Sequence, residues 1–588
     1  MHRKKIITIT IILTISLGFL LKPSEVESLP NISHTNILQD SVDRSSWSWQ
    51  EMEVVSIDAI INSRYPEIAI DSKNNVHIVW EEWTGGYDIH YRMWNYQTKS
   101  WSATENIAPL SGVAERPSIA IDKNDNVHVV WNDDNNYYGT TGTDWDIVYR
   151  MKAADSDTWT DIEVVSTEST DHSVYPSIDV DGSGNLHVVW YDGTDYLGCG
   201  TDADVFYKKW HSASSSWGTA EVVSTESTDH SSIAEVCVTD DEHVFVAWSD
   251  DTDYDSCGVD RDIFFKRRSP SGIWSSTEVI SWLATAQSEY VDIDCEDNGR
   301  IHIVWNDYTD MKDSGSDIDV FYVLYDPNLS TWLEPEVVSQ VSTMSSSQAT
   351  INIDVEGDIH ILWHDTVPYG GCGSDYDVLY IRKDSSTNTW SSTSVVSAES
   401  NGNSLYPEFK TDEFGYLHAI WVDNMDYLGA GTDLDIFYKK YVGPPGKPIL
   451  SSIIPNPSPL GNITLEWNDV IGAEEYSIYN SSSYITDISE LVPITISENS
   501  FVDSITIPGV YYYAIVASNE WGDSDLSNVE SVEILVSTDP PGFFQSLRLG
   551  EIVVLAAILG GFQLILTIIT YTLLKSRTTS NNLPKKKK

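Results

Sequence analysis

The chain has 588 residues, of which 89 are acidic and 34 basic, so its formal net charge is −55. This excess of acid argues against a nucleic-acid partner, because neutralising phosphate groups requires clustered Lys and Arg. A hydrophobic content of 41% argues against a disordered chain, and only 5 Cys argue against a disulfide-stapled scaffold.

The N-terminal residues have the pattern of an export signal. Basic residues at positions 3–5 precede an apolar run over 6–21, and a polar stretch follows. We therefore predict a signal peptide over residues 1–28 and a linker over 29–45. Because no clean cleavage site is present, an uncleaved N-terminal membrane anchor stays open as the alternative.

A unit of strands then recurs seven times along the chain. Each copy has an apolar strand, a tight turn rich in Asp, Asn and Gly, a second apolar strand that ends in Trp, and a third strand. The second strands end at Trp80, Trp131, Trp190, Trp248, Trp305, Trp363 and Trp421. A fourth strand that begins with Trp follows six of the copies, and its seventh copy stands ahead of the first repeat, over residues 49–56.

This arrangement predicts a closed ring. A four-stranded unit repeated around an axis is a β-propeller, which leaves only short, protected edges. We expect the displaced fourth strand to pair with the last repeat, residues 406–441, and so to join the two ends of the ring. The predicted fold class is all-β, with a seven-bladed propeller over residues 46–442.

Histidine is the first regular feature of the repeat. Six of the second strands carry His three residues before the Trp, and the fourth has Phe at this position: His77, His128, His187, Phe245, His302, His360 and His418. Ligands spread identically over six blades cannot converge on one metal ion. We therefore predict packed, hydrogen-bonded core histidines.

Acidic residues are the second regular feature, in the loops between the second and third strands. They stand two residues after the Trp, at the start of the third strand, and two residues before that start. We expect them on one face of the ring, where backbone capping, calcium binding and recognition of a cationic ligand are the alternatives. The candidate calcium ligands are Asp192, Asp195, Asp202, Asp204, Asp250, Asp260, Asp262, Asp307, Asp317 and Asp319.

Departures from the repeat give candidate ligand-binding residues on the same face. The loops that follow the second and third repeats share the sequence Ser-Thr-Glu-Ser-Thr-Asp-His-Ser, and the sixth repeat has a His directly after its Trp. The candidates are Asp171, His172, Asp229, His230 and His364. Ordinary sequence drift is the alternative interpretation.

The five cysteines fall into two classes. Cys199, Cys257 and Cys372 share one loop position, whereas Cys237 and Cys295 lie in first strands of adjacent repeats. Bridges between 199 and 257 and between 237 and 295 are both conceivable, which would leave Cys372 unpaired. None stands in a nucleophile motif with a partner His, so we do not expect a thiol enzyme.

The C-terminal part has a different sequence pattern. Residues 443–538 contain strands of alternating polar and apolar residues, as in a β-sandwich, with Trp467 in an early strand and a late Tyr-rich strand. They resemble a fibronectin type III domain. The resemblance implies a spacer or binding module without catalysis. After a juxtamembrane segment, 539–551, the uncharged run 552–574 predicts a transmembrane helix, and the basic tail 575–588 predicts a cytoplasmic C-terminus.

The propeller region resembles the sialidase or BNR-repeat propellers over about 400 residues, through its strand order, the Tyr-x-Lys/Arg ends of the third strands and the Trp that opens each fourth strand. The family's Asp-box survives only in eroded form at 384–390, no arginine triad can be assigned, and catalytic sialidases of this kind have six blades. A strongly acidic face is also a poor site for sialic acid, because like charges repel.

Two functions follow from these observations. The main hypothesis is a membrane-anchored extracellular binding or adhesion protein whose acidic face recognises a glycan, a protein or a cation-bridged ligand. The alternative is an exported, sialidase-like glycoside hydrolase or lyase that uses carboxylates on the same face. Calcium is the one cofactor that the residues suggest.

Overall fold

The computed structural model describes residues 44–535, apart from 60, 110–111, 136–143, 312–313 and 316. Within these residues the fold is all-β, and the one helical element is the 3₁₀ turn η1 (Arg44–Ser46). The predicted signal peptide, the 552–574 segment and the basic tail lie outside the described residues. No helix in the described part of the chain is long and apolar enough to cross a membrane.

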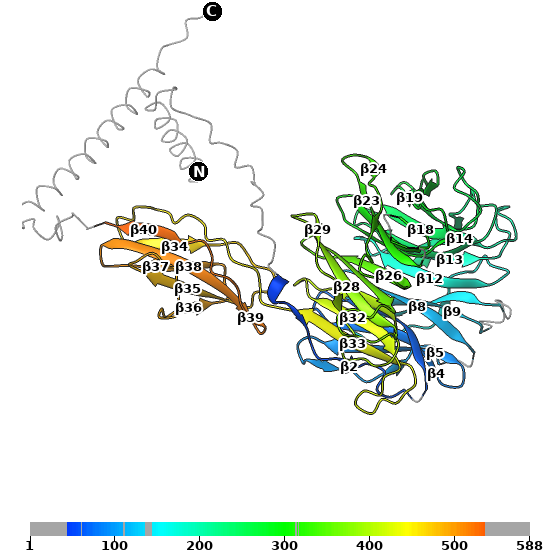
Figure 1. Cartoon of the computed structure of the whole chain (residues 1–588), viewed down its shortest axis with the longest axis horizontal. Coiled ribbons are helices and arrows are strands. Elements are labelled where there is room, and N and C mark those ends of the chain that lie inside the picture. The colour runs from blue at the N-terminus through cyan, green and yellow to red at the C-terminus, as the bar shows by residue number, and fades with distance from the viewer. Residues whose placement is uncertain are drawn as a thin grey trace, which may run out of the picture. The chain divides into compact units, whose positions relative to one another are not determined.

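Seven antiparallel sheets, each with four main strands, follow one another through residues 48–442 (Figure 1). Their first strands are β3 (Ser63–Ile70), β8 (Ala114–Ile121), β12 (Ser173–Val180), β17 (Ser231–Val238), β21 (Ser288–Cys295), β26 (Ser346–Ile353) and β31 (Ser404–Thr411). Their second strands are β4 (Val76–Trp83), β9 (Val127–Asp133), β13 (Leu186–Asp192), β18 (Val244–Asp250), β22 (Ile301–Asp307), β27 (Ile359–Asp365) and β32 (Leu417–Asp423).

The outer strands complete each sheet. The third strands are β5 (Tyr87–Asn95), β10 (Asp146–Lys152), β14 (Asp204–His211), β19 (Asp262–Arg268), β23 (Asp319–Asp326), β28 (Asp377–Asp384) and β33 (Asp435–Val442). The short pieces of the fourth strands are β6 (Ser100–Trp101), β7 (Glu105–Asn106), β11 (Glu163–Val164), β15 (Ser216–Trp217), β16 (Glu221–Val222), β20 (Glu278–Val279), β24 (Thr331–Trp332), β25 (Glu336–Val337), β29 (Thr389–Trp390) and β30 (Ser394–Val395).

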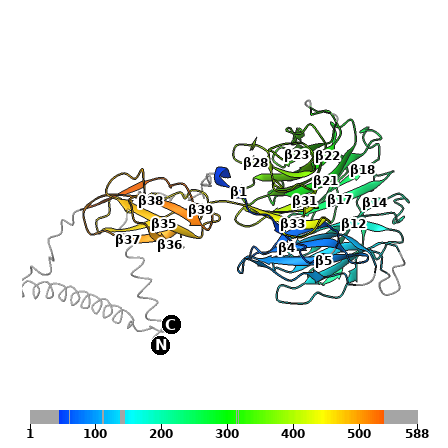
Figure 2. The same ribbon diagram turned by 60° about the horizontal axis from the view of Figure 1, so that its bottom comes forward.

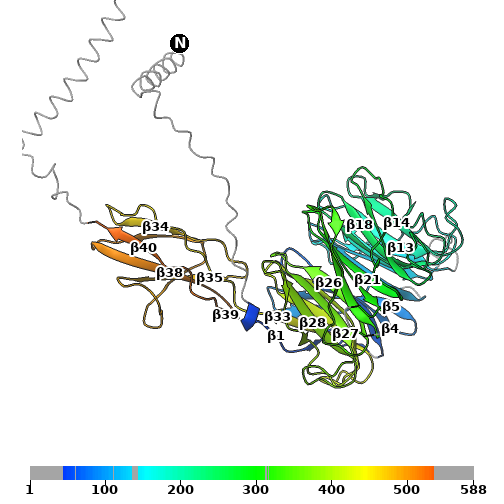
Figure 3. The same ribbon diagram turned by 45° about the horizontal axis from the view of Figure 1, so that its top comes forward.

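The sheets are arranged as in a propeller. Each first strand contacts the first strand of the next sheet, and β3 contacts β31, so the first strands form a closed ring. Figure 2 shows β12, β17 and β21 next to one another within this ring, and Figure 3 shows β26, β27 and β28 of one sheet side by side.

The N-terminal segment closes the last sheet, as predicted. The strands β1 (Ser48–Trp49) and β2 (Glu53–Val54) both pair with β33, with Trp49 opposite Tyr441 and Val54 opposite Phe437. Just ahead of them, the buried guanidinium of Arg44 donates to Asp358 of the neighbouring sheet at 2.8 Å. The first and last segments of the ring are therefore held together by strand pairing and by a buried ion pair.

Tryptophan and histidine have repeated structural roles. The seven repeated Trp residues lie two or three residues before the ends of the second strands and are fully buried. Each indole N–H donates to the carboxylate two residues later, as from Trp248 to Asp250 at 2.8 Å. The six His rings each hydrogen-bond a Tyr hydroxyl of the third strand, as His187 does with Tyr207 at 2.8 Å.

The exception in the fourth sheet supports this assignment. Phe245 replaces the His there, and its partner is Phe265 in place of a Tyr, with stacked rings 6.3 Å apart. Both members of the polar pair are thus replaced together. The prediction of hydrogen-bonded core histidines is confirmed.

One of the two conceivable disulfides is present. Cys237 in β17 is bridged to Cys295 in β21, with Cα atoms 6.1 Å apart. The other conceivable bridge, between 199 and 257, is not formed, because both thiols are free. Each instead points to a carbonyl of its own loop: Cys199 Sγ lies 3.4 Å from Thr194 O, and Cys257 Sγ lies 3.5 Å from Thr252 O.

Residues 444–535 form two further antiparallel sheets, β34–β37 and β36–β35–β38–β39, with β40 paired to β38. The strands are β34 (Asn462–Glu466), β35 (Glu475–Ser481), β36 (Ile494–Ile496), β37 (Ser500–Ser504), β38 (Gly509–Asn519), β39 (Gly522–Asp523) and β40 (Glu530–Ile534). Trp467, Tyr476 and Tyr513 are buried in one apolar cluster with residues of both sheets. A β-sandwich with its own core follows.

Candidate functional site

Each first strand of the ring contains a β-bulge at the same place. The register between the first and second strands shifts there in every sheet, for example between Arg64 and Glu67. The residue in the bulge has a positive φ of 47° to 54°, although it is never Gly: Tyr65, Arg116, Tyr175, Ile233, Tyr290, Gln348 and Tyr406. A bulge re-aims a side chain, and all seven of these residues line a central cavity.

This cavity has a volume of about 570 Å³ and is lined by all seven first strands. The bulge residues form its mouth layer. Because alternate residues of a strand face the same side, two more layers follow. The middle layer is Glu67, Ser118, Ser177, Glu235, Asp292, Thr350 and Glu408, and the inner layer is Ala69, Ala120, Asp179, Cys237, Asp294, Asn352 and Lys410.

The mouth layer opens on the face that carries the acidic loops. Ser63, at the start of β3, lies opposite Glu82, near the end of β4, so both ends point to the same side. The loop that leads into β12 also meets the acidic loop of that sheet, since the backbone N–H groups of Thr170 and Asp171 donate to Thr194 Oγ1. We call this side the loop face.

Aromatic rings and one cation dominate the mouth layer. The rings of Tyr65 and Tyr406 lie 4.6 Å apart. The guanidinium of Arg116 stacks between Tyr65 at 3.3 Å and Tyr175 at 4.4 Å, and it makes no hydrogen bond or ion pair to another described residue. Its N–H groups are therefore available to an anionic ligand, for which a planar guanidinium is well suited.

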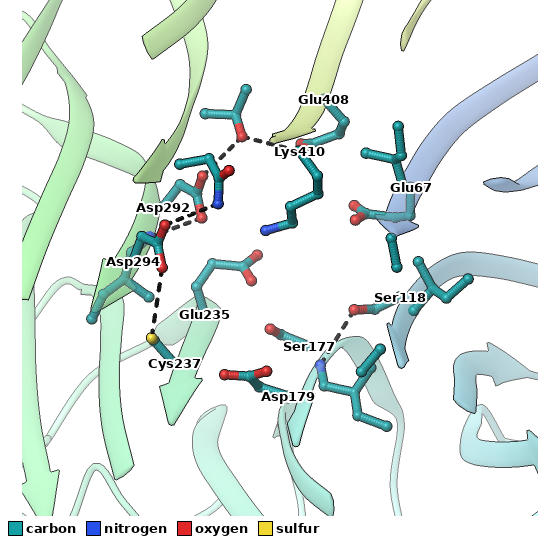
Figure 4. Close-up of a pocket in the computed structure, with 18 of the residues that line it drawn as sticks. Glu67, Ser118, Ser177, Asp179, Glu235, Cys237, Asp292, Asp294, Glu408 and Lys410 are labelled. Atoms are coloured by element: carbon teal, nitrogen blue, oxygen red, sulfur yellow. Dashed lines mark hydrogen bonds between the residues drawn. The ribbon is translucent and has the colours of Figure 1, made fainter. Parts of the chain in front are cut away.

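Carboxyl groups dominate the middle layer. Figure 4 shows Glu67, Glu235, Asp292 and Glu408 around the ammonium group of Lys410. Burial raises the pKa of Glu67 to about 8, against an ordinary value of 4.5. Burial, together with the charges of neighbouring carboxylates, also raises the pKa of Glu235 and of Glu408 well above the usual range.

The hydroxyl group of Thr350 contacts two of these carboxyls. Thr350 Oγ1 lies 2.9 Å from an oxygen of Asp292 and 3.0 Å from an oxygen of Glu408. Asp292 also accepts a hydrogen bond from the backbone N–H of Ile351 at 2.8 Å. Burial nevertheless raises the pKa of Asp292 above its ordinary value, although Lys410 and donors of this kind favour the ionised carboxylate.

The inner layer continues the acidic character. Burial raises the pKa of Asp179 to about 7, although the carboxylate accepts two backbone N–H groups. Burial lowers the pKa of Lys410, but the charges of Asp294, Asp292 and other carboxylates outweigh it, so the net shift is upward. The lysine is therefore a fixed positive charge, and a role as a neutral amine nucleophile is excluded near pH 7.

The predicted ligand-binding residues are on the loop face but outside the cavity lining. Asp171, His172 and Asp229 are exposed, and His230 is half-buried. Asp229 lines a separate, smaller hollow of about 480 Å³ between loops.

His364 is the predicted residue that lies nearest the mouth. It is buried, and its ring is 5.3 Å from that of Tyr376 and 6.2 Å from that of Tyr406. Burial lowers its pKa to about 4, so the imidazole is neutral at pH 7. It could accept or donate one proton near the tyrosine ring.

The candidate calcium ligands fall into three groups. Those two residues after a Trp are buried and fully hydrogen-bonded, as the backbone-capping alternative expects: Asp192, Asp250 and Asp307. Those that open third strands are buried, with one oxygen on a Ser hydroxyl: Asp204, Asp262 and Asp319. The others lie within the loops: Asp195, Asp202, Asp260 and Asp317.

No three His, Cys, Asp or Glu side chains in the described residues are grouped closely enough to hold a metal ion by themselves. A cation at these loops would therefore need main-chain carbonyls or water among its ligands, both of which calcium accepts.

The cavity carboxyls were missed from the sequence, although a signal existed. The first strands read as apolar, yet Glu67, Glu235, Asp292 and Glu408 occupy one repeat position, and Asp179, Asp294 and Lys410 occupy another two residues later. Charged residues at alternate positions of buried strands indicate a polar interior surface. Aligning the repeats by position would have identified them.

Comparisons with known proteins gave the following results. No family model and no curated protein matches the chain. Solved structures that are similar include the polysaccharide lyase Uly1, 13% identical with a TM-score of 0.42, over 64% of this chain and 89% of that one. An ulvan lyase is 11% identical with a TM-score of 0.45, over 65% and 95% of the two chains.

An intramolecular trans-sialidase from Ruminococcus gnavus is also similar, at 11% identity and a TM-score of 0.34, over 64% of this chain and 94% of that one. We draw no argument about activity from likenesses of this degree.

Proposed function

We propose that the protein is an exported enzyme that cleaves a glycan at the mouth of the central cavity, by hydrolysis of a glycosidic bond. One observation carries the proposal. Four buried carboxyls with raised pKa values surround the ammonium group of Lys410 in one cavity, beneath a mouth of tyrosine rings and one unpaired guanidinium. Glycosidases use a pair of carboxyls, and burial can keep one of them protonated near neutral pH as the general acid.

The layers suggest a division of roles. A protonated Glu67, Glu235 or Glu408 would donate to the leaving oxygen. Asp292, whose ionised form is favoured by Lys410, by Thr350 and by a backbone N–H, would act as the carboxylate partner. Arg116 would bind a carboxylate or sulfate group of the sugar through its free N–H groups. An acidic sugar would thus meet a cation at the mouth before it meets the carboxyls.

The surrounding architecture is part of the proposal. We take the seven sheets as the blades of a seven-bladed propeller and residues 443–538 as a fibronectin type III spacer. The 552–574 segment would anchor the protein in the cell membrane, with the bulk of the chain outside and the tail in the cytoplasm. The partners would be an extracellular glycan and the membrane, without nucleic acid.

The test is a hydrolysis screen with the full chain purified in detergent. A panel of neutral, uronate-containing and sulfated polysaccharides would be assayed for new reducing ends and for unsaturated sugars. We expect new reducing ends from at least one substrate, and their loss in Glu67→Gln and Glu408→Gln but not in the exposed control Glu51→Gln. Unsaturated sugars would show that the glycosidic bond is cleaved by elimination and not by hydrolysis. Binding without any product would favour the adhesion hypothesis instead.

A further inference from the structure

The middle-layer carboxyls lie inside a closed wall of strands. Glu67, Glu235, Asp292 and Glu408 belong to β3, β17, β21 and β31. Each first strand contacts the next one, and β3 contacts β31, so the wall is continuous around the cavity. A glycosidic bond that is brought to these carboxyls therefore has to enter along the axis of the ring, and a glycan reaches them with its chain end first.

The mouth layer narrows this entry. Four of its residues form one arc in which each ring or guanidinium packs against the next: Tyr406, Tyr65, Arg116 and Tyr175. The hydroxyl groups of Tyr65 and Tyr406 are 3.5 Å apart, which ties one end of the arc together. The cavity volume of about 570 Å³ is that of an ordinary small-molecule site. The cavity therefore suits the end of a chain and not a long stretch of polysaccharide.

The spacing of the layers sets the positions of successive sugars. Each middle-layer residue stands two positions after the bulge residue of its strand, and each inner-layer residue stands two positions further on. Neighbouring layers are thus roughly 7 Å apart along the strands, which is comparable with the length of one sugar residue. When the bond to be cleaved lies at the middle layer, the second sugar lies at Arg116 and the terminal sugar lies between the middle and inner layers.

The inner layer presents hydrogen-bond acceptors to this terminal sugar, because its own donors are engaged. Asn352 Nδ2 donates to Asp294 Oδ2 at 3.0 Å, and the backbone N–H of Ile353 donates to the same oxygen at 2.7 Å. The backbone N–H of Val238 donates to Asp179 at 2.7 Å. Carboxylate oxygens keep further lone pairs, which can accept from the hydroxyl or amino groups of a ligand.

The charges of the inner layer disfavour an acidic terminal sugar. The one cation among the described residues of this layer is Lys410. Four carboxylates already act on its ammonium group: Asp294, Asp292, Glu408 and Asp179. A carboxylate or sulfate group beside Asp179 and Asp294 would add a negative charge to an existing excess, and like charges placed together are costly. Arg116, by contrast, has free N–H groups at the mouth.

We propose that the cavity takes a glycan end-on, with a terminal sugar that carries hydroxyl or amino groups but no acid in the inner part, and an acidic second sugar at Arg116. The inference rests on the proposed function, because it places the bond to be cleaved at the middle layer. Each cleavage would then release one terminal sugar. The order of charges along the axis, a cation at the mouth and carboxyls further in, determines which sugar occupies which position.

The binding test uses three trisaccharides whose two ends carry the same charge, so the direction of the chain does not matter. They are hexose–uronate–hexose, uronate–hexose–uronate and an all-hexose trisaccharide. Their affinities for the full-chain Glu67→Gln variant in detergent would be measured by calorimetry. We expect hexose–uronate–hexose to bind about tenfold more tightly than either of the others, as for one charge-assisted hydrogen bond. Equal affinities for the three would overturn the inference.

Two further substitutions in the same background separate the parts of the site. Arg116→Ala should make hexose–uronate–hexose and the all-hexose trisaccharide bind equally, because the cation at the mouth is lost. Asp294→Asn keeps the shape of the side chain and should bring the affinity for uronate–hexose–uronate closer to that for hexose–uronate–hexose. The exposed control Glu51→Gln should change none of the three affinities. An unchanged preference in Arg116→Ala would contradict the position of the acidic sugar.

The products of the wild-type protein test end-on entry separately. From the polysaccharide that the hydrolysis screen identifies, we expect single sugars from the earliest time point, with a slow fall in viscosity. Oligosaccharides of mixed length at the start would overturn end-on entry while the glycan-cleaving function stood. Selective binding of hexose–uronate–hexose without any product would contradict the cleaving function and support the end-on site.

Discussion

Replacing Glu67 by Gln should stabilise the protein, and the gain should depend on pH. Burial raises the pKa of this carboxyl from 4.5 to about 8. Between these values the folded state holds a proton that the unfolded state has released, so the stability of the wild type falls as pH rises. Below about pH 4.5 both states are protonated, and this contribution disappears.

The size of the effect follows from the shift. A displacement from 4.5 to about 8 corresponds to an upper limit of about 5 kcal/mol at pH 9. Because several neighbouring carboxyls share the protons, we expect Glu67→Gln to gain about 2 kcal/mol at pH 9 and close to nothing at pH 4. Gln keeps the shape and loses the titratable proton.

The assay is denaturant unfolding followed by tryptophan fluorescence, which the buried Trp residues of the ring dominate. Wild type, Glu67→Gln and the exposed control Glu51→Gln would be compared at pH 4, 6.5 and 9. A gain that is the same at every pH, or a loss of stability at pH 9, would refute the protonated, buried carboxyl.

Three further variants test the ring itself. Arg44→Ala should cost about 3–5 kcal/mol in unfolding free energy, because it leaves buried carboxylates without their cation; a loss below 1 kcal/mol would argue against the clamp. His187→Phe should cost about 1–3 kcal/mol, and adding Tyr207→Phe should restore part of it, as in the natural Phe pair; strict additivity in this double-mutant cycle would contradict the pairing. Cys237→Ser should cost about 2–4 kcal/mol under oxidising conditions and nothing under reducing ones, since the bridge to Cys295 closes a separation of 58 residues.

The ring was predictable because its signals are periodic. The Trp that ends each second strand fixed the number of repeats, and Trp49, standing ahead of the first repeat, identified the closing strand. The histidines could be assigned from a single exception, Phe245, because a metal ligand would not be exchanged for a hydrophobic ring.

The site was less predictable for physical reasons. The bulges place Tyr65 and its six counterparts at positive φ. Because none of these residues is Gly, the sequence gives no signal for this backbone conformation. Glu67 and Glu408 stand in strands that otherwise read as buried and apolar, so their common cavity becomes visible only when the strands are arranged in a ring.

For the acidic loops, the sequence identified the residues but not their roles. Asp250 and Asp204 occupy two different repeated positions of the acidic loops and are both buried, yet Asp250 accepts hydrogen bonds on both oxygens, whereas burial raises the pKa of Asp204. The difference lies in hydrogen-bond geometry. Sequence could therefore name the residues of the acidic face without separating capping groups from candidate cation ligands.

The most direct test of the account is the structure of the Glu67→Gln protein with an oligosaccharide from a cleaved or bound polysaccharide. We expect a sugar against the rings of Tyr65 and Tyr175, with an acidic group on Arg116 and a glycosidic oxygen within hydrogen-bond distance of a middle-layer carboxyl. An oligosaccharide that lies instead on the outer loops beside Asp171 and His172, with the cavity free of sugar, would contradict the assignment of the site.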